Sequence, residues 1–127
     1  MQITVQHMIQ NRETGDVEGF RDVALVNAWQ FEDVNEALEY AWRYTNNVMG
    51  SWSLKIGEDA NDDVEVLVKR EDGLGLRSSM MGDRFEVDGV EYRVAAFGFK
   101  KVKIGNLAQH ILNGGAIFDN SGDTVCC

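Results

Sequence analysis

The sequence predicts an α+β domain in which an antiparallel β-sheet of about five to six strands packs against one main helix. Three observations support this class. Several short segments alternate apolar and polar residues, residues 33–47 repeat apolar residues at helical spacing, and an Asp-Gly pair joins two alternating segments. The chain has 127 residues, of which 44% are hydrophobic, so it has material for one core but not for two ordinary domains. We therefore expect a single domain over residues 1–120 and a frayed tail over 121–127.

The first two strands are predicted to form a hairpin. Ile3, Val5 and His7 alternate with polar residues, and a second apolar segment covers residues 20–29. The polar residues 14–16 form the tip of the expected loop. The residues of the second strand expected on one face are Val23, Leu25 and Asn27.

The main helix is predicted over residues 33–47. Asp33 is suited to cap its start, and Glu36 stands three residues later, as in a capping box. Asn46 and Asn47 tolerate left-handed backbone, so the helix is expected to end there. The apolar residues that follow at helical spacing are Val34, Ala37, Leu38, Ala41 and Tyr44.

Residues 51–63 are expected to form a loop, in which the alternation of Trp52, Leu54 and Ile56 leaves room for a short strand. A third strand is expected over residues 64–68, where valines alternate with other residues.

The strongest local signal is a hairpin with Asp88-Gly89 at its tip. This pair is typical of a two-residue type I′ turn, which fixes the register and places Val87 opposite Val90. The residues then expected on the core face are Phe85, Val87, Val90, Tyr92 and Val94. The diagonal pairs of opposite charge expected on the other face are Arg84 with Glu91 and Glu86 with Arg93.

Beyond the hairpin, the apolar spacing predicts a short C-terminal helix at about 106–113, ended by two glycines. Residues 116–118 fit a last edge strand.

The chain is strongly acidic, with 12 Lys and Arg against 21 Asp and Glu and a net charge of -9. Binding to nucleic-acid phosphates needs cations, so direct contact with nucleic acid is not expected. Residues 1–63 hold 12 acidic and 4 basic residues, and this half would steer a basic partner toward it. The alternative is a solvated face that only keeps the protein soluble. The residues predicted to contact a partner are Glu32, Asp33, Glu36, Glu39, Glu58, Asp59, Asp62 and Asp63.

No catalytic or metal-binding set emerges from the sequence. His7 and His110 are the two histidines, and the two cysteines stand together at 126–127, so no zinc-ligand spacing forms. No Ser or Cys stands in a nucleophile motif. We therefore expect a protein that is not an enzyme and holds no metal or cofactor. The cysteine usage and the lack of a long apolar run favour the cytoplasm and no membrane contact.

Residues 76–99 carry a recognisable pattern made of Arg77-Ser78-Ser79, Gly82-Asp83, Asp88-Gly89, Tyr92 and Gly98-Phe99. The pattern resembles small proteins encoded by phages, prophages and mobile elements, and it is similar to the YodL-type domains of mobile elements. Upstream, Thr45-Asn46-Asn47 and Ser51-Trp52 fit the same resemblance, which covers roughly residues 1–100. The resemblance implies a phage-like origin and an α+β fold, and it implies no reaction.

Residues 77–83 have two open interpretations. In a structural turn, Ser78 and Ser79 bond to nearby backbone, Gly82 takes a positive φ and Asp83 accepts from the turn's amides. In a binding site, the arginine of this segment offers a planar fork to a carboxylate or phosphate. The residues of that candidate anion or nucleotide pocket are Arg77, Ser78, Ser79, Arg93 and Trp52.

Three functions remain as hypotheses. The first, which we favour, is a phage-type accessory protein that binds stoichiometrically and inhibits a host defence or nucleic-acid-handling protein through that protein's basic surface. The second is a homo-oligomer that sequesters a nucleotide-like signalling molecule without turnover. The third is a virion or replication scaffold. A homodimer, in which Lys100, Lys101 and Lys103 contact the acidic half of a second copy, is also left open.

Overall fold

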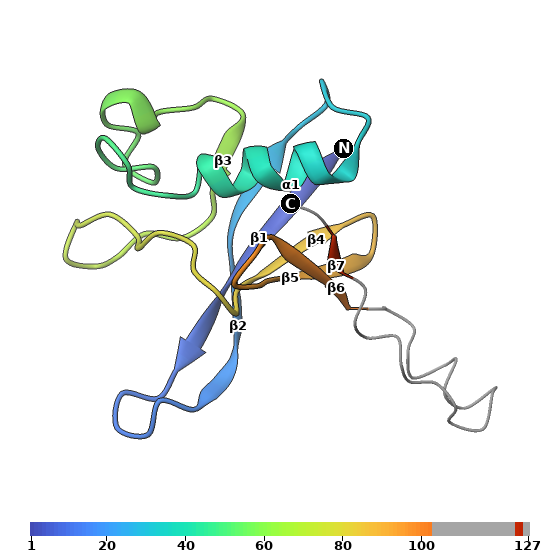
Figure 1. Cartoon of the computed structure of the whole chain (residues 1–127). Coiled ribbons are helices and arrows are strands. Elements are labelled where there is room, and N and C mark those ends of the chain that lie inside the picture. The colour runs from blue at the N-terminus through green and yellow to red at the C-terminus, as the bar shows by residue number, and fades with distance from the viewer. Residues whose placement is uncertain (103–123, 126–127) are drawn as a thin grey trace, which may run out of the picture.

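The computed structural model describes residues 1–102 together with the backbone of Thr124 and Val125, and it confirms the α+β class with one main helix (Figure 1). The sheet is antiparallel throughout and has the strand order β3-β2-β1-β4-β5-β6-β7. The strands are β1 (Gln2–Gln10), β2 (Val17–Asn27), β3 (Val64–Val66), β4 (Arg84–Val87), β5 (Val90–Val94), β6 (Phe99–Val102) and β7 (Thr124–Val125).

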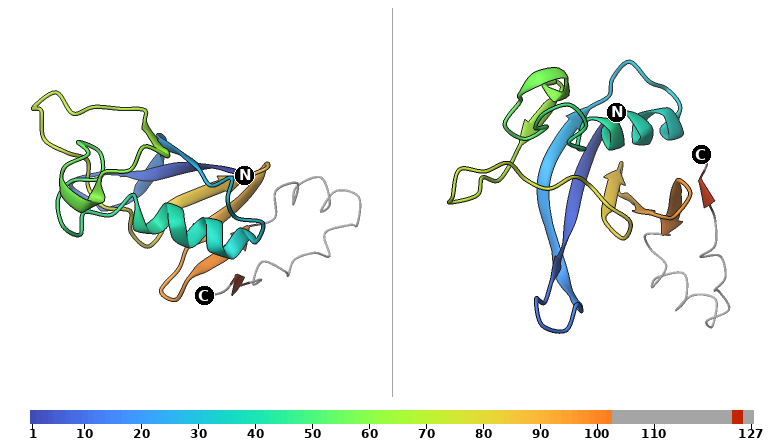
Figure 2. Two further views of the ribbon diagram at one scale, coloured as in Figure 1. Left: turned by 90° about the horizontal axis from the view of Figure 1, so that it is seen from above. Right: turned by 60° about the vertical axis from the view of Figure 1, so that its left-hand side comes forward.

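The helix α1 (Val34–Arg43) lies along one face of the sheet (Figure 2). The predicted cap is confirmed, because the Asp33 side chain accepts a hydrogen bond from the backbone N–H of Asn35. The helix ends earlier than the predicted residue 47, and here the prediction is corrected. At this end the side-chain hydroxyl of Thr45, and not its backbone N–H, donates to the carbonyl of Ala41 four residues earlier, so the helical backbone pattern stops.

A β-bulge changes which residues of β2 face the core. Val5 pairs with Ala24 while Gln6 pairs with Asp22, so Val23 is an extra residue in β2. The predicted common face of Val23, Leu25 and Asn27 is therefore wrong. One extra residue shifts the alternation, so the buried side chains beyond the bulge belong to other positions. These buried positions are Ala24, Val26 and Ala28.

The hairpin of β4 and β5 has the predicted register, with Val87 opposite Val90. Asp88 and Gly89 have φ angles of +50° and +80°, as the type I′ turn requires. Of the two diagonal ion pairs expected on its outer face, Arg84 with Glu91 forms at 3.1 Å.

The core fills the space between α1 and the sheet, and Trp52 and Phe85 are its largest fully buried side chains. Trp52 does not belong to a strand. A bridge between Ser51 and Ile56 closes a tight loop there, followed by the short 3₁₀ helix η1 (Gly57–Asp59). The buried apolar residues are Ile3, Val5, Val23, Ala24, Val26, Ala28, Ala37, Leu38, Ala41, Trp52, Val64, Phe85, Val87, Tyr92, Val94 and Phe99.

Three further predictions concern the end of the chain. The helix at about 106–113 and the edge strand at 116–118 lie outside the described residues. Thr124 and Val125 fall in the predicted frayed tail, but they pair with β6, whose edge offers unpaired backbone groups. Within the described residues, α1 is too short and too polar to cross a membrane.

Candidate functional site

The segment from Arg77 to Asp83 is held together by an ion pair between its two ends. Arg77 donates from Nη1 to Asp83 Oδ2 over 2.8 Å and from Nη2 to Oδ1 over 2.9 Å. Asp83 is fully buried, and its carboxylate also accepts the backbone N–H groups of Met8 (2.8 Å) and Met80 (2.7 Å). Four donors thus surround one carboxylate, which stabilises its charge away from water. The arginine fork expected to bind a ligand is engaged by the chain's own Asp83.

The same segment is attached to the loop that follows α1. Ser78 Oγ accepts from the backbone N–H of Asn47 over 2.8 Å, and the Trp52 indole donates to the carbonyl of Arg77 over 2.9 Å. Gly82 has a φ of +97°, as predicted. The serine therefore does bond to backbone, but to a residue 31 positions away rather than to a close neighbour.

A directed chain of hydrogen bonds connects β1 to α1. The Thr45 hydroxyl donates to the carbonyl of Ala41 over 2.8 Å, so its single proton is already used. Ser79 Oγ, 2.8 Å from Thr45 Oγ1, must then donate to it. His7 Nε2, 3.1 Å from Ser79 Oγ, must in turn donate to the serine. His7 therefore carries its proton on Nε2.

Sequence reasoning did not foresee that His7, Ser79 and Asp83 come together. The group differs from a catalytic triad, in which the histidine accepts the serine proton and the carboxylate holds the opposite ring nitrogen. Here a single atom, Nε2, faces Ser79 and also lies 3.8 Å from Asp83 Oδ2. Burial lowers the pKa of His7 to about 4, with Asp83 opposing the shift and Arg77 adding to it. Ser79 is only 4% exposed, so the group forms an internal polar network.

The five residues predicted as an anion pocket do not line a common cavity. Trp52 lies in the core and Ser79 is buried. Arg93 alternates with the buried Tyr92 and Val94, so it projects from the other face of the sheet. Strand alternation and burial separate these side chains, which corrects the predicted grouping.

Arg77 instead lines a cavity of about 310 Å³ between the β1–β2 hairpin and residues 70–77. Sequence reasoning missed Arg21 and Arg70 as members of this cavity. The signal for Arg21 was its pairing with His7 across the hairpin, which becomes visible once the bulge in β2 is known. The lining residues are His7, Met8, Ile9, Arg21, Val23, Arg70, Leu76 and Arg77.

The acidic residues around the start of α1 are exposed, as a partner-binding surface requires. Glu36 and Glu39 lie three residues apart on the side of the helix that faces away from Ala37, Leu38 and Ala41. We call the exposed carboxylates at this place the helix acids, namely Glu32, Asp33, Glu36 and Glu39.

Asp59 does not belong to an exposed acidic surface, which corrects its predicted role. Its side chain is fully buried, and Oδ2 accepts the three consecutive N–H groups of residues 48–50 over 2.6–2.9 Å. Arg43 also donates to Oδ1 over 3.1 Å. Burial by itself raises the pKa of Asp59, but these hydrogen bonds outweigh it and hold the pKa below its usual range. Asp59 therefore fixes the loop after α1, while Glu58 and Asp62 remain exposed.

Asp63 is also partly engaged inside the molecule. The Tyr40 hydroxyl donates to Asp63 Oδ2 over 2.5 Å, and Asn61 Nδ2 donates to the same hydroxyl over 2.9 Å. Burial, followed by the bond to Asp63, raises the pKa of Tyr40. These contacts hold residues 57–63 beside α1, so the second acidic stretch lies along the same helix as the helix acids.

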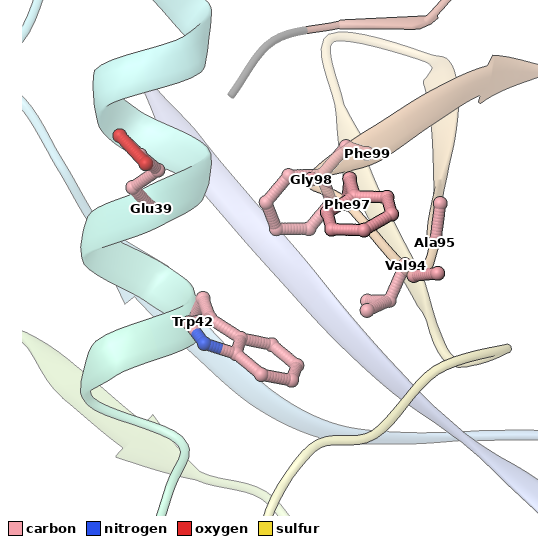
Figure 3. Close-up of a pocket in the computed structure, with 8 residues that line it drawn as sticks. Glu39, Trp42, Val94, Ala95, Phe97, Gly98 and Phe99 are labelled. Carbon is pink, nitrogen blue, oxygen red and sulfur yellow. The ribbon is translucent and has the colours of Figure 1, made fainter.

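An apolar groove of about 360 Å³ lies between α1 and the turn that joins β5 to β6 (Figure 3). Glu39 and Trp42 line it from the helix, and Val94, Phe97 and Phe99 line it from the sheet side. Phe97 is 87% exposed, although a phenylalanine is usually buried. The groove thus places an apolar surface directly beside one of the helix acids.

The described residues contain no group of three His, Cys, Asp or Glu side chains arranged to hold a metal ion. Comparison with protein-family models, with curated proteins and with solved structures finds no match to this chain. The resemblance to phage-type and YodL-type proteins therefore stays a prediction from the residues of the motif.

Proposed function

We propose that this protein acts by stoichiometric binding to a protein with a basic surface, and that it inhibits a host defence or nucleic-acid-handling protein on behalf of a phage-type element. The observation that supports this function best is the apolar groove beside the helix acids. Because the groove offers contact area and the carboxylates offer charge, the two together suit a protein partner with basic residues around an apolar anchor.

The charge distribution supports the same partner. Residues 31–65 contain nine acidic and two basic residues. One base, Arg43, binds Asp59, and the other, Lys55, donates to the carbonyls of Asn61 and Val64. Neither basic residue of this stretch therefore neutralises the exposed carboxylates on α1. Their negative charge would raise the rate at which a basic protein associates.

The groove supplies what carboxylates alone do not. Exposed ion pairs contribute little free energy, because water and salt screen them. Aromatic side chains at the centre of an interface carry much more of the binding energy. Phe97 is already exposed beside Trp42 in the groove, so binding there would bury both rings. We therefore expect the groove to set affinity and the helix acids to set the approach and orientation of the partner.

The test is affinity capture from a bacterial lysate with three variants of matched design. One variant replaces the helix acids by their amides; Asn at position 33 still caps the helix. Its control makes the same four-charge change in the β1–β2 hairpin, at Glu13, Asp16, Glu18 and Asp22. The third variant is Phe97→Ala, which removes an exposed ring and is expected to leave the fold intact.

The proposal expects a basic protein that the wild type and the hairpin control capture at low salt. The helix variant and Phe97→Ala are expected to lose it, and about 0.5 M salt is expected to weaken its capture. The captured protein is then purified and assayed for loss of its activity at a one-to-one ratio. Equal capture by all variants, or full activity at saturation, would contradict the proposal.

A further inference from the structure

The cavity beside the β1–β2 hairpin has a lining unlike the rest of this acidic chain. It contains three arginines and one histidine but no Asp or Glu, in a protein with a net charge of -9. The cavity lies over the part of the hairpin beyond the bulge, away from the groove lined by Glu39 and Phe97. It therefore concerns a different surface from the one in the proposed function, and neither depends on the other.

The three arginines come from β2 and from the segment between β3 and β4, and each is placed by a different contact. Arg21 is opposite His7 in the β1–β2 pairing, so both side chains are on the same face of the hairpin. Arg77 is oriented by its two hydrogen bonds to Asp83. Arg70 is oriented by two bonds to Asp72, from Nε over 3.0 Å and from Nη2 over 2.5 Å. The convergence is thus built by pairing and ion pairs rather than by adjacent residues in the sequence.

The pairing leaves hydrogen-bond donors unused at the cavity. A guanidinium has five N–H donors, and the two bonds of Arg70 to Asp72 use only two of them. Arg21 is exposed and forms no ion pair with any residue from 1 to 102. The cavity therefore offers net positive charge and free donors, and what it lacks is an acceptor.

The apolar part of the lining limits what the acceptor can be. Met8, Ile9, Val23 and Leu76 line the same cavity as the arginines. A volume of about 310 Å³ fits a small molecule rather than a protein chain. Three arginines match the three terminal oxygens of a phosphate monoester better than the two oxygens of a carboxylate.

We propose that this cavity binds a small organic phosphate monoester, with the phosphate on Arg21, Arg70 and Arg77 and the organic part on the apolar lining. Arg77 keeps the four hydrogen bonds of its Nη1 and Nη2 groups to Asp83, Ser78 and Met8, and it offers its Nε–H and its positive charge to the phosphate. The proposal is one of binding alone, and the hydrogen bonds of His7 Nε2 and Ser79 Oγ are already directed into the protein.

The test is a titration followed by ¹⁵N–¹H NMR, with phenyl phosphate, inorganic phosphate and benzoate as probes. Phenyl phosphate is expected to shift the amides of residues 7–9, 21–23 and 76–77 and to bind most tightly. Inorganic phosphate tests the anion alone, and benzoate tests a carboxylate on the same apolar body. Arg21→Gln is expected to weaken the binding of phenyl phosphate by at least about tenfold, which corresponds to the loss of one charge-assisted hydrogen bond.

The matched control is Arg12→Gln, which makes the same charge change near the tip of the hairpin but away from the cavity. This control is expected to bind phenyl phosphate within about twofold of wild type. Equal weakening by both variants would mean that only the overall charge attracts the anion, and this overturns the site. Equal binding of all three probes, or no shifts at the named amides, would also overturn it. None of these outcomes bears on capture of a basic protein by the groove.

Discussion

Replacement of Asp83 by Asn gives the sharpest test of how the Arg77–Asp83 segment is held. Each oxygen of this carboxylate accepts two donors: Oδ1 from Met8 N and Arg77 Nη2, and Oδ2 from Met80 N and Arg77 Nη1. In Asn, an NH₂ group replaces one of the two carboxylate oxygens. In either orientation of the amide, this NH₂ group faces two N–H donors, one from the backbone and one from Arg77, and it cannot accept their hydrogen bonds. The variant is also isosteric, so a loss of stability reports hydrogen bonding and charge rather than a cavity.

The expected loss follows from the burial of the pair. Breaking a buried ion pair by removing one partner costs about 3–5 kcal/mol. Asp83 is fully buried, but the Arg77 side chain is 38% exposed and regains some hydration, so we expect the lower end, about 3 kcal/mol. For a domain with a stability of about 5–15 kcal/mol, this is a large fraction. In urea it corresponds to a decrease of about 1–3 M in the unfolding midpoint.

The assay is urea unfolding followed by fluorescence, with two comparisons. Asp72→Asn removes an ion pair whose two side chains are 49% and 47% exposed, and it is expected to leave the midpoint almost unchanged. Arg77→Met combined with Asp83→Asn completes a double-mutant cycle, in which the two losses are expected to be strongly non-additive. A loss below about 1 kcal/mol for Asp83→Asn, or additive losses in the cycle, would refute the reasoning.

Three further predictions concern other positions. Burial lowers the pKa of His7 from 6.5 to about 4, so the unfolded chain binds more protons between these values and stability falls as the pH drops from 6.5 through 4; an imidazole NMR titration midpoint near 6.5 would contradict this. Although burial raises the pKa of Asp59, hydrogen bonds lower it overall, so stability is lost as the pH falls below about 4; Asp59→Asn is expected to flatten this acid limb in urea midpoints measured against pH. Gly89 has a φ of +80°, so Gly89→Ala is expected to cost about 1–2 kcal/mol, and an unchanged melting temperature would argue against a strained turn.

Local features of the fold could be predicted because their causes lie within a few residues. The Asp88-Gly89 turn fixes the register of β4 and β5 through backbone angles that these two residues accept. Asp33 caps α1 through a bond to an amide two residues away. The start of the helix and the core face of this hairpin were correct for the same reason.

The candidate site could be predicted only in part. The sequence indicated that the guanidinium of Arg77 binds a carboxylate or a phosphate. It did not indicate that this carboxylate is Asp83 of the same chain. Asp59 was predicted as a surface charge, but it is buried. Its three amide donors come from residues 48–50, on the far side of a loop, and no local pattern in the sequence indicates that contact. A side chain's type says what it is able to bind, whereas its partner depends on chain folding.

The sequence by itself therefore determined the class of fold, the central hairpin and the excess of negative charge, since these follow from alternation, turn chemistry and composition. Tertiary structure decided which charges are exposed and which are used inside. The single extra residue at Val23 shifts the face of β2, and the pairing of Arg21 with His7 creates a cationic cavity in an acidic protein. Such outcomes depend on contacts between residues far apart in the chain, and local preferences do not specify them.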